Sequence, residues 1–251
     1  MPEPLLRVEQ ISKRFGGLLA VDQASFDAPA GCITALIGPN GAGKTTLFAI
    51  IAGFLRPSAG RVVYDGADIT GLPPHRLARR GIARTFQIVQ PFAGLTVREN
   101  IAVGCHLSRP HHADALAAAA DIAHAIDLGA QLERPAAALT VAGRKRLELA
   151  RALAIGPKLL LLDEVLAGLN PSEIRDIVPA IRDIARRGVT ILMVEHVMQA
   201  VMSLAAHVFV LAEGRIIAEG SPQQVAADRH VIEAYLGHGA ASRMTAGAGH
   251  G

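Results

Sequence analysis

The chain has 251 residues, long enough for one large domain or for a domain with a subdomain. Its 25 lysine and arginine residues against 22 aspartate and glutamate residues give a net charge of +3, too small to indicate a nucleic-acid partner. No apolar run approaches the roughly 18 residues that a membrane-spanning helix needs, yet 51% of the residues are hydrophobic. This high share predicts that some of the apolar surface docks onto something else. The two cysteines, Cys32 and Cys105, are too few for a disulfide framework and fit a reducing compartment.

The residues before position 38 predict β-structure. In residues 5–12 apolar and polar side chains alternate, which places Leu6 and Gln10 on the same face of a strand. A second strand is expected at residues 21–28, and the apolar run at residues 33–37 predicts a third.

A glycine-rich stretch directly follows the third strand, and residues 47–52 after it predict a helix. The stretch matches the phosphate-binding pattern G-x-x-x-x-G-K-[S/T], whose glycines let backbone N–H groups converge on a phosphate. Lys44 would reach the β- and γ-phosphates, and Thr45 would offer its hydroxyl to Mg²⁺. The sequence therefore predicts binding of a nucleoside triphosphate. The nucleotide-binding residues expected in this stretch are Gly38, Pro39, Asn40, Gly41, Ala42, Gly43, Lys44, Thr45 and Thr46.

Phe15 lies upstream of this loop, in an expected turn between the first two strands. Its ring could stack on an adenine base, because an aromatic face gains dispersion energy beside a planar base without specific hydrogen bonds. Packing in the core is an equally good interpretation of its position, so both stay open at this point.

The middle of the chain changes from strands to helices. A strand is expected at residues 82–86 and ends at Gln87. From about residue 91 to residue 156 the pattern is helical, and an alanine-rich stretch fits helix well because alanine is the strongest helix former. We therefore predict a helical subdomain inserted into an α/β core. Its expected helices span residues 97–107, 113–128 and 141–154.

The α/β pattern returns with four consecutive leucines at residues 159–162, typical of a parallel strand buried on both faces. Asp163 and Glu164 follow this strand directly. Ser172 is expected to cap the next helix at its N-terminus. Another buried strand at residues 190–194 precedes Glu195 and His196, and a hairpin with two short helices is expected to follow.

Polar residues thus follow several apolar strands, where ligands of parallel α/β sheets bind. Each of them alone could be an ordinary loop residue. Together they suit phosphate chemistry: Asp163 would bind Mg²⁺ with Thr45, and Glu164 would accept a proton from an attacking water. His196 and Gln87 could donate to the γ-phosphate or orient that water. Water is the only nucleophile for which the sequence shows a base. This set therefore favours hydrolysis over transfer of the phosphoryl group to another substrate.

These residues resemble the motifs of the ATP-binding-cassette (ABC) ATPases. The resemblance implies an α/β fold of the P-loop NTPase class, with a RecA-like core, an antiparallel β subdomain and an inserted α-helical subdomain. It implies that Asp163 is the Walker B aspartate, Glu164 the catalytic base and His196 the switch histidine. Gln87 would contact Mg²⁺ and face a membrane partner, and Phe15 would stack on adenine.

The family signature Leu-Ser-Gly-Gly-Gln falls on residues 139–143, and the chain departs from it there. Thr140 keeps a hydroxyl, whereas Ala142 replaces the second glycine and Gly143 the glutamine. The resemblance implies that Thr140 and Ala142 contact the nucleotide of a second subunit. Within the family, the stretches similar to the cassettes of branched-chain amino-acid importers are residues 84–87, 95–100, 167–171 and 231–237.

The resemblance covers nearly all of residues 5–237. We therefore expect residues 1–237 to form a single ABC nucleotide-binding domain, with the α-helical subdomain at about 91–156 and a flexible tail at 238–251. It implies ATP and Mg²⁺ as cofactors, and as partners a second ATP-binding subunit, transmembrane permease subunits and, through them, a substrate-binding protein. The chain would lie peripherally on the cytoplasmic face of the inner membrane. Two alternatives stay open: a cassette of a lipopolysaccharide-export transporter, and a soluble ABC ATPase without a transport role.

Overall fold

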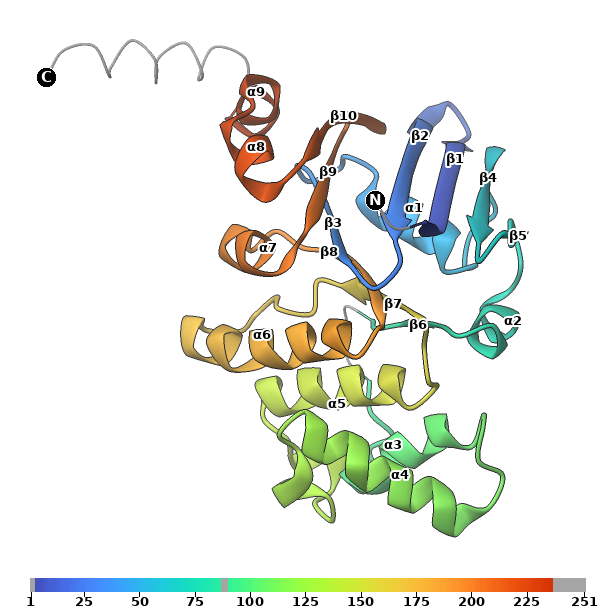
Figure 1. The fold of residues 1–251 in the computed structure, drawn as a ribbon, viewed down its shortest axis with the longest axis vertical. Helices are drawn as coiled ribbons and strands as arrows, with labels where there is room; N and C mark the ends of the chain where they lie inside the picture. Colours follow the sequence, from blue (N-terminus) through green and yellow to red (C-terminus); the bar gives the residue numbers. More distant parts are fainter. Residues whose placement is uncertain (1–2, 87–89, 237–251) are drawn as a thin grey trace, which may run out of the picture. The chain divides into compact units, whose positions relative to one another are not determined.

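The computed structural model describes residues 3–86 and 90–236 (Figure 1). The chain forms two compact units. The first unit comprises residues 1–71 and 194–251, and the second comprises residues 72–193. None of the helices in the described part of the chain has the length and apolar character needed to cross a membrane.

The first unit opens with a four-stranded antiparallel sheet in the order β2-β1-β4-β5. Alternating side chains give its strands one apolar face, on which Val8, Phe26 and Val62 are buried. The strands are β1 (Pro4–Phe15), β2 (Leu18–Pro29), β4 (Ala59–Tyr64) and β5 (Ala67–Asp68).

Strand β1 contains a β-bulge at Gln10 that the alternating pattern does not reveal. Val8 pairs with Phe26 but Ile11 pairs with Ala24, so β1 has one residue more than β2 over this interval. Gln10 has a positive φ of 49° and is exposed, while Ile11 is fully buried. The prediction that Gln10 shares the face of Leu6 is therefore wrong, because the extra residue reverses the alternation.

The same unit holds three strands side by side in the order β10-β9-β3. Strand β3 runs parallel to β9, β9 is antiparallel to β10, and every residue of β3 is buried, as its apolar run predicts. The strands are β3 (Ile33–Ile37), β9 (His207–Ala212) and β10 (Arg215–Gly220). The helices are α1 (Lys44–Ile51), α7 (Met198–Leu204), α8 (Pro222–Ala227) and α9 (Arg229–Leu236), of which α7 was not predicted.

In the second unit, β6 runs parallel to β7, and the strands follow the order β8-β7-β6. All four leucines of β7 have no exposed surface, which is the burial expected of a central strand. The strands are β6 (Ile82–Arg84), β7 (Leu159–Asp163) and β8 (Thr190–Val194), whose last residue belongs to the first unit. Parallel strands that alternate with helices confirm the predicted α/β class.

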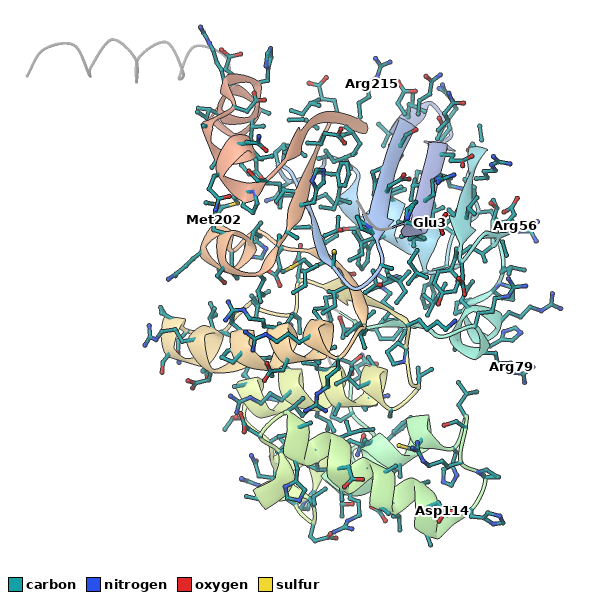
Figure 2. The ribbon with its side chains drawn as sticks, in the orientation of Figure 1. Glu3, Arg56, Arg79, Asp114, Met202 and Arg215 are labelled. Atoms are coloured by element: carbon teal, nitrogen blue, oxygen red, sulfur yellow. The ribbon has the colours of Figure 1, made fainter. Side chains whose placement is uncertain are left out.

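The helices of the second unit include those predicted between about residues 91 and 156. Helix α3 packs against both α4 and α5, and charged side chains such as Arg79 on α2 and Asp114 on α4 extend away from the ribbon (Figure 2). The α-helices are α2 (Pro74–Arg79), α3 (Val97–Cys105), α4 (His112–Ala125), α5 (Val141–Leu153) and α6 (Pro171–Arg186). Two short 3₁₀ helices, Gly129–Gln131 and Ala136–Ala138, lie between α4 and α5.

The N-cap of helix α6 lies two residues earlier than predicted, because Asn170 and not Ser172 caps it. The Asn170 side-chain oxygen accepts the N–H groups of Ser172 at 2.9 Å and Glu173 at 3.0 Å. The Glu173 carboxylate accepts the Asn170 N–H at 2.9 Å in return, which completes a capping box. Pro171 occupies the first helical position, where its fixed φ suits the helix and its missing N–H costs nothing.

Gly60, inside β4, and Gly66, in the turn after it, provide a matched test of how β4 packs against β1. A Cβ at Gly60 would overlap backbone atoms of Glu9 and Gln10, whereas a Cβ at Gly66 would meet nothing within 4 Å. Both residues have positive φ, 85° and 73°. We expect Gly66→Ala to lower the free energy of unfolding by about 1 kcal/mol through backbone strain alone. Gly60→Ala should cost about 2–4 kcal/mol because backbone overlap adds to that strain. Urea unfolding of both variants measures the difference, and equal costs would contradict the packing of β4 on the bulge.

Candidate active site

The predicted phosphate loop connects β3 to α1 and depends on two glycines that no other residue can replace. A Cβ at Gly38 would overlap the carbonyl oxygen of Leu211, and one at Gly43 would overlap that of Ala20. Both clashes involve backbone atoms, which cannot rotate away. Gly43 is also the N-cap of α1, with φ 102° and no side chain on the cap, so N–H groups of the first turn point out of the helix start.

Lys44 and the loop backbone hold each other in place. The Lys44 side chain is buried, and its Nζ donates to the carbonyl oxygens of Gly38 at 2.7 Å and Pro39 at 2.9 Å. Tyr235 on α9 also lies close to the Gly38 backbone, and no local sequence pattern predicts this contact. The structure thus places the Lys44 ammonium group against the backbone of the loop, and Thr45 beside it is exposed.

Two other predicted residues of the first unit are exposed. Phe15 stands at the end of β1 with 45% of its surface exposed, and Nζ of Lys13 lies 5.1 Å from the centre of its ring. This exposure excludes core packing, one of the two interpretations left open, and leaves the ring available for stacking. His196 follows β8 and is exposed, next to the fully buried Glu195.

In the second unit, the acidic pair lies at the end of β7. Asp163 is buried, its N–H donates to Oγ1 of Thr85 at 3.1 Å, and its Oδ2 accepts Nη2 of Arg84 at 2.6 Å. Glu164 has a positive φ of 46°, and its carbonyl oxygen accepts Nζ of Lys145 at 3.3 Å. A left-handed backbone at a residue other than glycine is strained, and such strain concentrates at functional sites.

Gln87 lies outside the described residues, but the segments on either side of it are anchored. The N–H of Phe86 donates to the Glu148 carboxylate at 3.2 Å, and Arg151 donates to the same carboxylate at 3.0 Å and to the Gln90 carbonyl at 3.1 Å. Burial raises the pKa of Glu148, and the charge of Arg151 opposes that rise. The sequence analysis did not predict this role of Glu148. The signal that could have indicated it is a carboxylate among the apolar residues on the buried face of α5.

The predicted signature residues start helix α5. Thr140 is its N-cap, and its Oγ1 accepts the N–H of Gly143 at 3.1 Å. Thr140 is exposed and Ala142, in the first turn, is partly exposed. The hydroxyl that the chain keeps at position 140 therefore has a local structural role in addition to any contact with a nucleotide.

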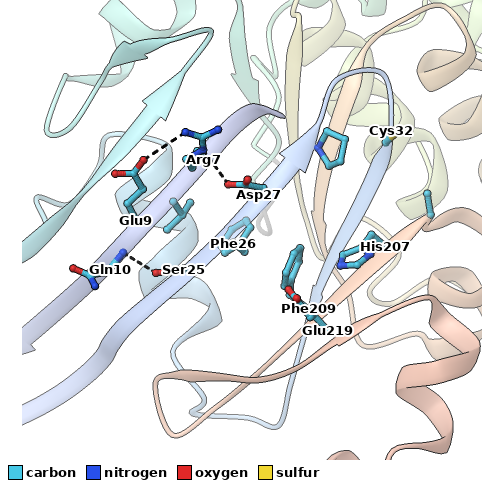
Figure 3. A pocket seen from close by; sticks show the side chains of 13 residues that line it. Arg7, Glu9, Gln10, Ser25, Phe26, Asp27, Cys32, His207, Phe209 and Glu219 are labelled. Carbon is cyan, nitrogen blue, oxygen red and sulfur yellow. Dashed lines mark hydrogen bonds and ion pairs between the residues drawn. The ribbon is translucent and has the colours of Figure 1, made fainter. Parts of the chain in front are cut away.

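A cavity of about 720 Å³ in the first unit is lined by none of the residues predicted to bind nucleotide or metal or to act in catalysis (Figure 3). Its wall includes Phe26 and Phe209, whose ring centres are 5.1 Å apart, and Cys32, which directly precedes β3. The cavity thus lies at the end of β3 opposite to the phosphate loop. Glu9, Asp27 and Glu219 also line it, and such carboxylates would repel a triphosphate.

Comparisons with known proteins agree with these motifs. The family model described as "ABC transporter" matches residues 21–167, and one described as "Branched-chain amino acid ATP-binding cassette transporter" matches residues 215–241. The chain is 38% identical to the branched-chain amino-acid transport ATP-binding protein BraF of Pseudomonas aeruginosa and to LivG of Escherichia coli, in each case over 94% of this chain and 99% of the relative. The chain belongs to this family of ABC transporter ATP-binding proteins.

Solved structures of ABC cassettes share its fold. A nucleotide-free ATP-binding cassette from an ABC transporter superposes with a TM-score of 0.86 at 34% identity, covering 94% of this chain and all of that one. A second cassette, in its ADP conformation, gives 0.85 at the same identity and coverage. The predicted family and the predicted ABC cassette fold are both confirmed. The division into one domain with a helical subdomain, and the roles of individual residues, stay predictions.

The contact between Thr85 and the end of β7 gives a test of how the ABC cassette holds Asp163. Thr85→Val removes the Oγ1 acceptor at nearly constant volume and leaves the buried N–H of Asp163 unsatisfied. We expect the free energy of unfolding to fall by about 1–3 kcal/mol. Thr85→Ser keeps the hydroxyl and should lose distinctly less. Chemical denaturation compares the three proteins, and an equal loss in both variants would show that the hydroxyl contributes little.

Proposed function

We propose that the chain is the ATP-binding and ATP-hydrolysing subunit that powers an ABC importer for branched-chain, hydrophobic amino acids. The observation that carries the proposal is the match over 94% of the chain to proteins named for high-affinity branched-chain amino-acid transport. The match favours this import role over the alternatives of a lipopolysaccharide-export cassette and a soluble ABC ATPase.

The loop in the first unit is proposed to bind the triphosphate. Glycines at positions 38 and 43 allow the backbone to pass close to neighbouring carbonyls, and the N–H groups at the start of α1 favour an anion. Lys44 would exchange its carbonyl partners for phosphate oxygens, which are stronger acceptors because they are charged. Phe15 offers its exposed face to the adenine base.

The strand end in the second unit is proposed to supply the metal ligand and the base. Asp163, with Thr45 and Gln87, would hold Mg²⁺, which when bound neutralises charge that develops on the phosphates. Glu164 would accept a proton from a water molecule as the water oxygen bonds to the γ-phosphorus and the bond to ADP breaks. His196 would orient the water or donate to the γ-phosphate.

The partners follow from the same assignment. A second ATP-binding subunit is proposed to present the start of its α5, with Thr140 and Ala142, to the nucleotide. Permease subunits would provide the membrane path and the contact for Gln87, and a substrate-binding protein would deliver the amino acid to them. The chain would then lie at the cytoplasmic face of the inner membrane, attached through the permease.

Lys44→Ala tests the nucleotide site and the transport role together. It removes the side-chain cation of the loop, so binding of a fluorescent ATP analogue should weaken at least about 100-fold. Cells that carry this variant as their copy of the subunit should lose uptake of radiolabelled leucine. Lys158→Ala, which removes an exposed lysine far along the chain, serves as the control and should keep both. Unchanged analogue affinity in Lys44→Ala would remove the loop from the proposal, whereas lost affinity with normal leucine uptake would contradict the substrate.

Glu164→Gln tests hydrolysis and the composite site. The amide cannot accept the proton, so the variant should bind ATP without turnover and accumulate an ATP-dependent dimer. Adding Thr140→Asp keeps a good N-cap on α5 but brings a negative charge toward the phosphates of the partner, so the dimer should be lost while each monomer still binds ATP. Thr140→Ser is the matched control and should dimerise normally. Light scattering at high protein concentration measures the result; monomers throughout, or equal dimers in all variants, would contradict the composite site.

A further inference from the structure

Arg84 and Asp163 form a buried ion pair that the proposed chemistry does not use. Nη2 of Arg84 lies 2.6 Å from Oδ2 of Asp163, and the two side chains are only 14% and 5% exposed. A carboxylate so far from water is costly unless a cation lies beside it. Arg84 is therefore the counter-cation of the residue that we assign to the metal.

The neighbours of Arg84 fix it in this position. Thr85, the next residue, accepts the N–H of Asp163, so two consecutive residues hold the backbone and the side chain of the same aspartate. The Arg84 guanidinium carbon also lies 5.7 Å from the centre of the Phe86 ring, within the range of a cation–π contact. Phe86 is the last described residue before Gln87.

Mg²⁺ needs several oxygen ligands and loses its water reluctantly. Within residues 3–86 and 90–236, no group of three or more His, Cys, Asp and Glu side chains is placed to hold a metal ion. Most ligands must then come from the nucleotide phosphates and from water. A divalent cation at Asp163 would also repel the guanidinium that already neutralises it, because like charges in a buried site are screened weakly.

We infer that Arg84 is a positioning residue that neutralises Asp163 until Mg²⁺ arrives with the nucleotide and takes its place. The inference rests on the proposed metal role of Asp163. The exchange makes metal binding depend on the triphosphate, and it removes the guanidinium from the Phe86 ring. Binding of the metal–nucleotide complex thereby changes the surroundings of Phe86, the residue directly before Gln87.

Thermal unfolding of Arg84→Gln separates this role from a purely structural one. In EDTA without nucleotide, the variant leaves Asp163 buried without its cation, and its Tm should fall below that of the natural protein by about 5–10 °C. With Mg²⁺ and a non-hydrolysable ATP analogue, the metal replaces the guanidinium, so the gap should shrink to less than about half. Arg84→Lys keeps the positive charge and should stay near the natural protein under both conditions.

A gap that is unchanged by Mg²⁺ and analogue would show a structural ion pair and overturn the inference. A larger gap would overturn it too, because Arg84 would then orient the carboxylate for the metal instead of giving way to it. Asp163→Asn separates this from the proposed function. If analogue binding keeps its Mg²⁺ dependence in Asp163→Asn, the metal role of Asp163 fails; if the dependence is lost while the Arg84→Gln gap stays unchanged, only the Arg84 inference fails.

A second measurement covers the case in which Arg84→Gln does not fold. The chain contains no tryptophan, so Phe86→Trp introduces a single fluorescent reporter under the guanidinium. Its emission should change when analogue and Mg²⁺ are both present, and should stay constant with analogue in EDTA. An emission that is insensitive to Mg²⁺, or that changes equally in EDTA, would overturn the exchange.

Discussion

The close approach of backbone to backbone around the phosphate loop is the constraint on which the first unit depends. Gly38 lies against the carbonyl of Leu211 and Gly43 against that of Ala20, so the loop is pressed between β9 and β2. The Gly214 N–H donates to the Ala42 carbonyl at 3.0 Å, which ties the β9–β10 turn to the same loop. The two sheets of the unit therefore meet at the loop, and a side chain at either glycine would force them apart.

Two ion pairs fix local geometry inside the apolar interior of the second unit. Arg84 on β6 pairs with Asp163 on the neighbouring strand β7, and Arg151 pairs with Glu148 three residues earlier in α5. Buried ion pairs add little net stability, because desolvation offsets most of the attraction, but loss of one partner is costly. Their presence is better explained by the geometry they impose: one pair fixes the end of β7, and the other fixes Phe86 beside Gln87.

Motifs defined by neighbouring residues were predictable from the sequence, and contacts between distant residues were not. The phosphate loop and the leucine strand each show their pattern within a few positions, because one local geometry requires all of their residues. The bulge at Gln10 was not predicted, because a single extra residue in a strand has no compositional signal of its own. Asn170 lies in the stretch 167–171 that resembles a family motif, and Pro171 and Glu173 beside it carry the signal of a capping box.

The contact between Arg84 and Asp163 is another contact between distant residues that could not be predicted from the sequence. Arg84 and Asp163 are joined by the parallel pairing of β6 and β7, a long-range register that no local pattern encodes. In the sequence, Arg84 belonged to a stretch that merely resembled one subgroup of cassettes. In the structure each residue of 84–86 makes a specific contact. The Arg84 side chain and the Thr85 hydroxyl contact Asp163, and the Phe86 N–H donates to Glu148.

The unusual signature at the start of α5 can be judged by the same physical reasoning. Thr140 uses its hydroxyl to cap the N–H of Gly143, so the threonine preserves the helix start that a serine would provide. The N–H groups of Val141 and Ala142 precede the capped one in the first turn, and helix geometry directs them out of the end of α5. An anion at this end would interact with those groups and with the helix dipole, neither of which depends on a glycine at position 142. The methyl group of Ala142 changes the shape presented to a partner nucleotide but leaves the donors in place, so the variant signature is compatible with the composite site.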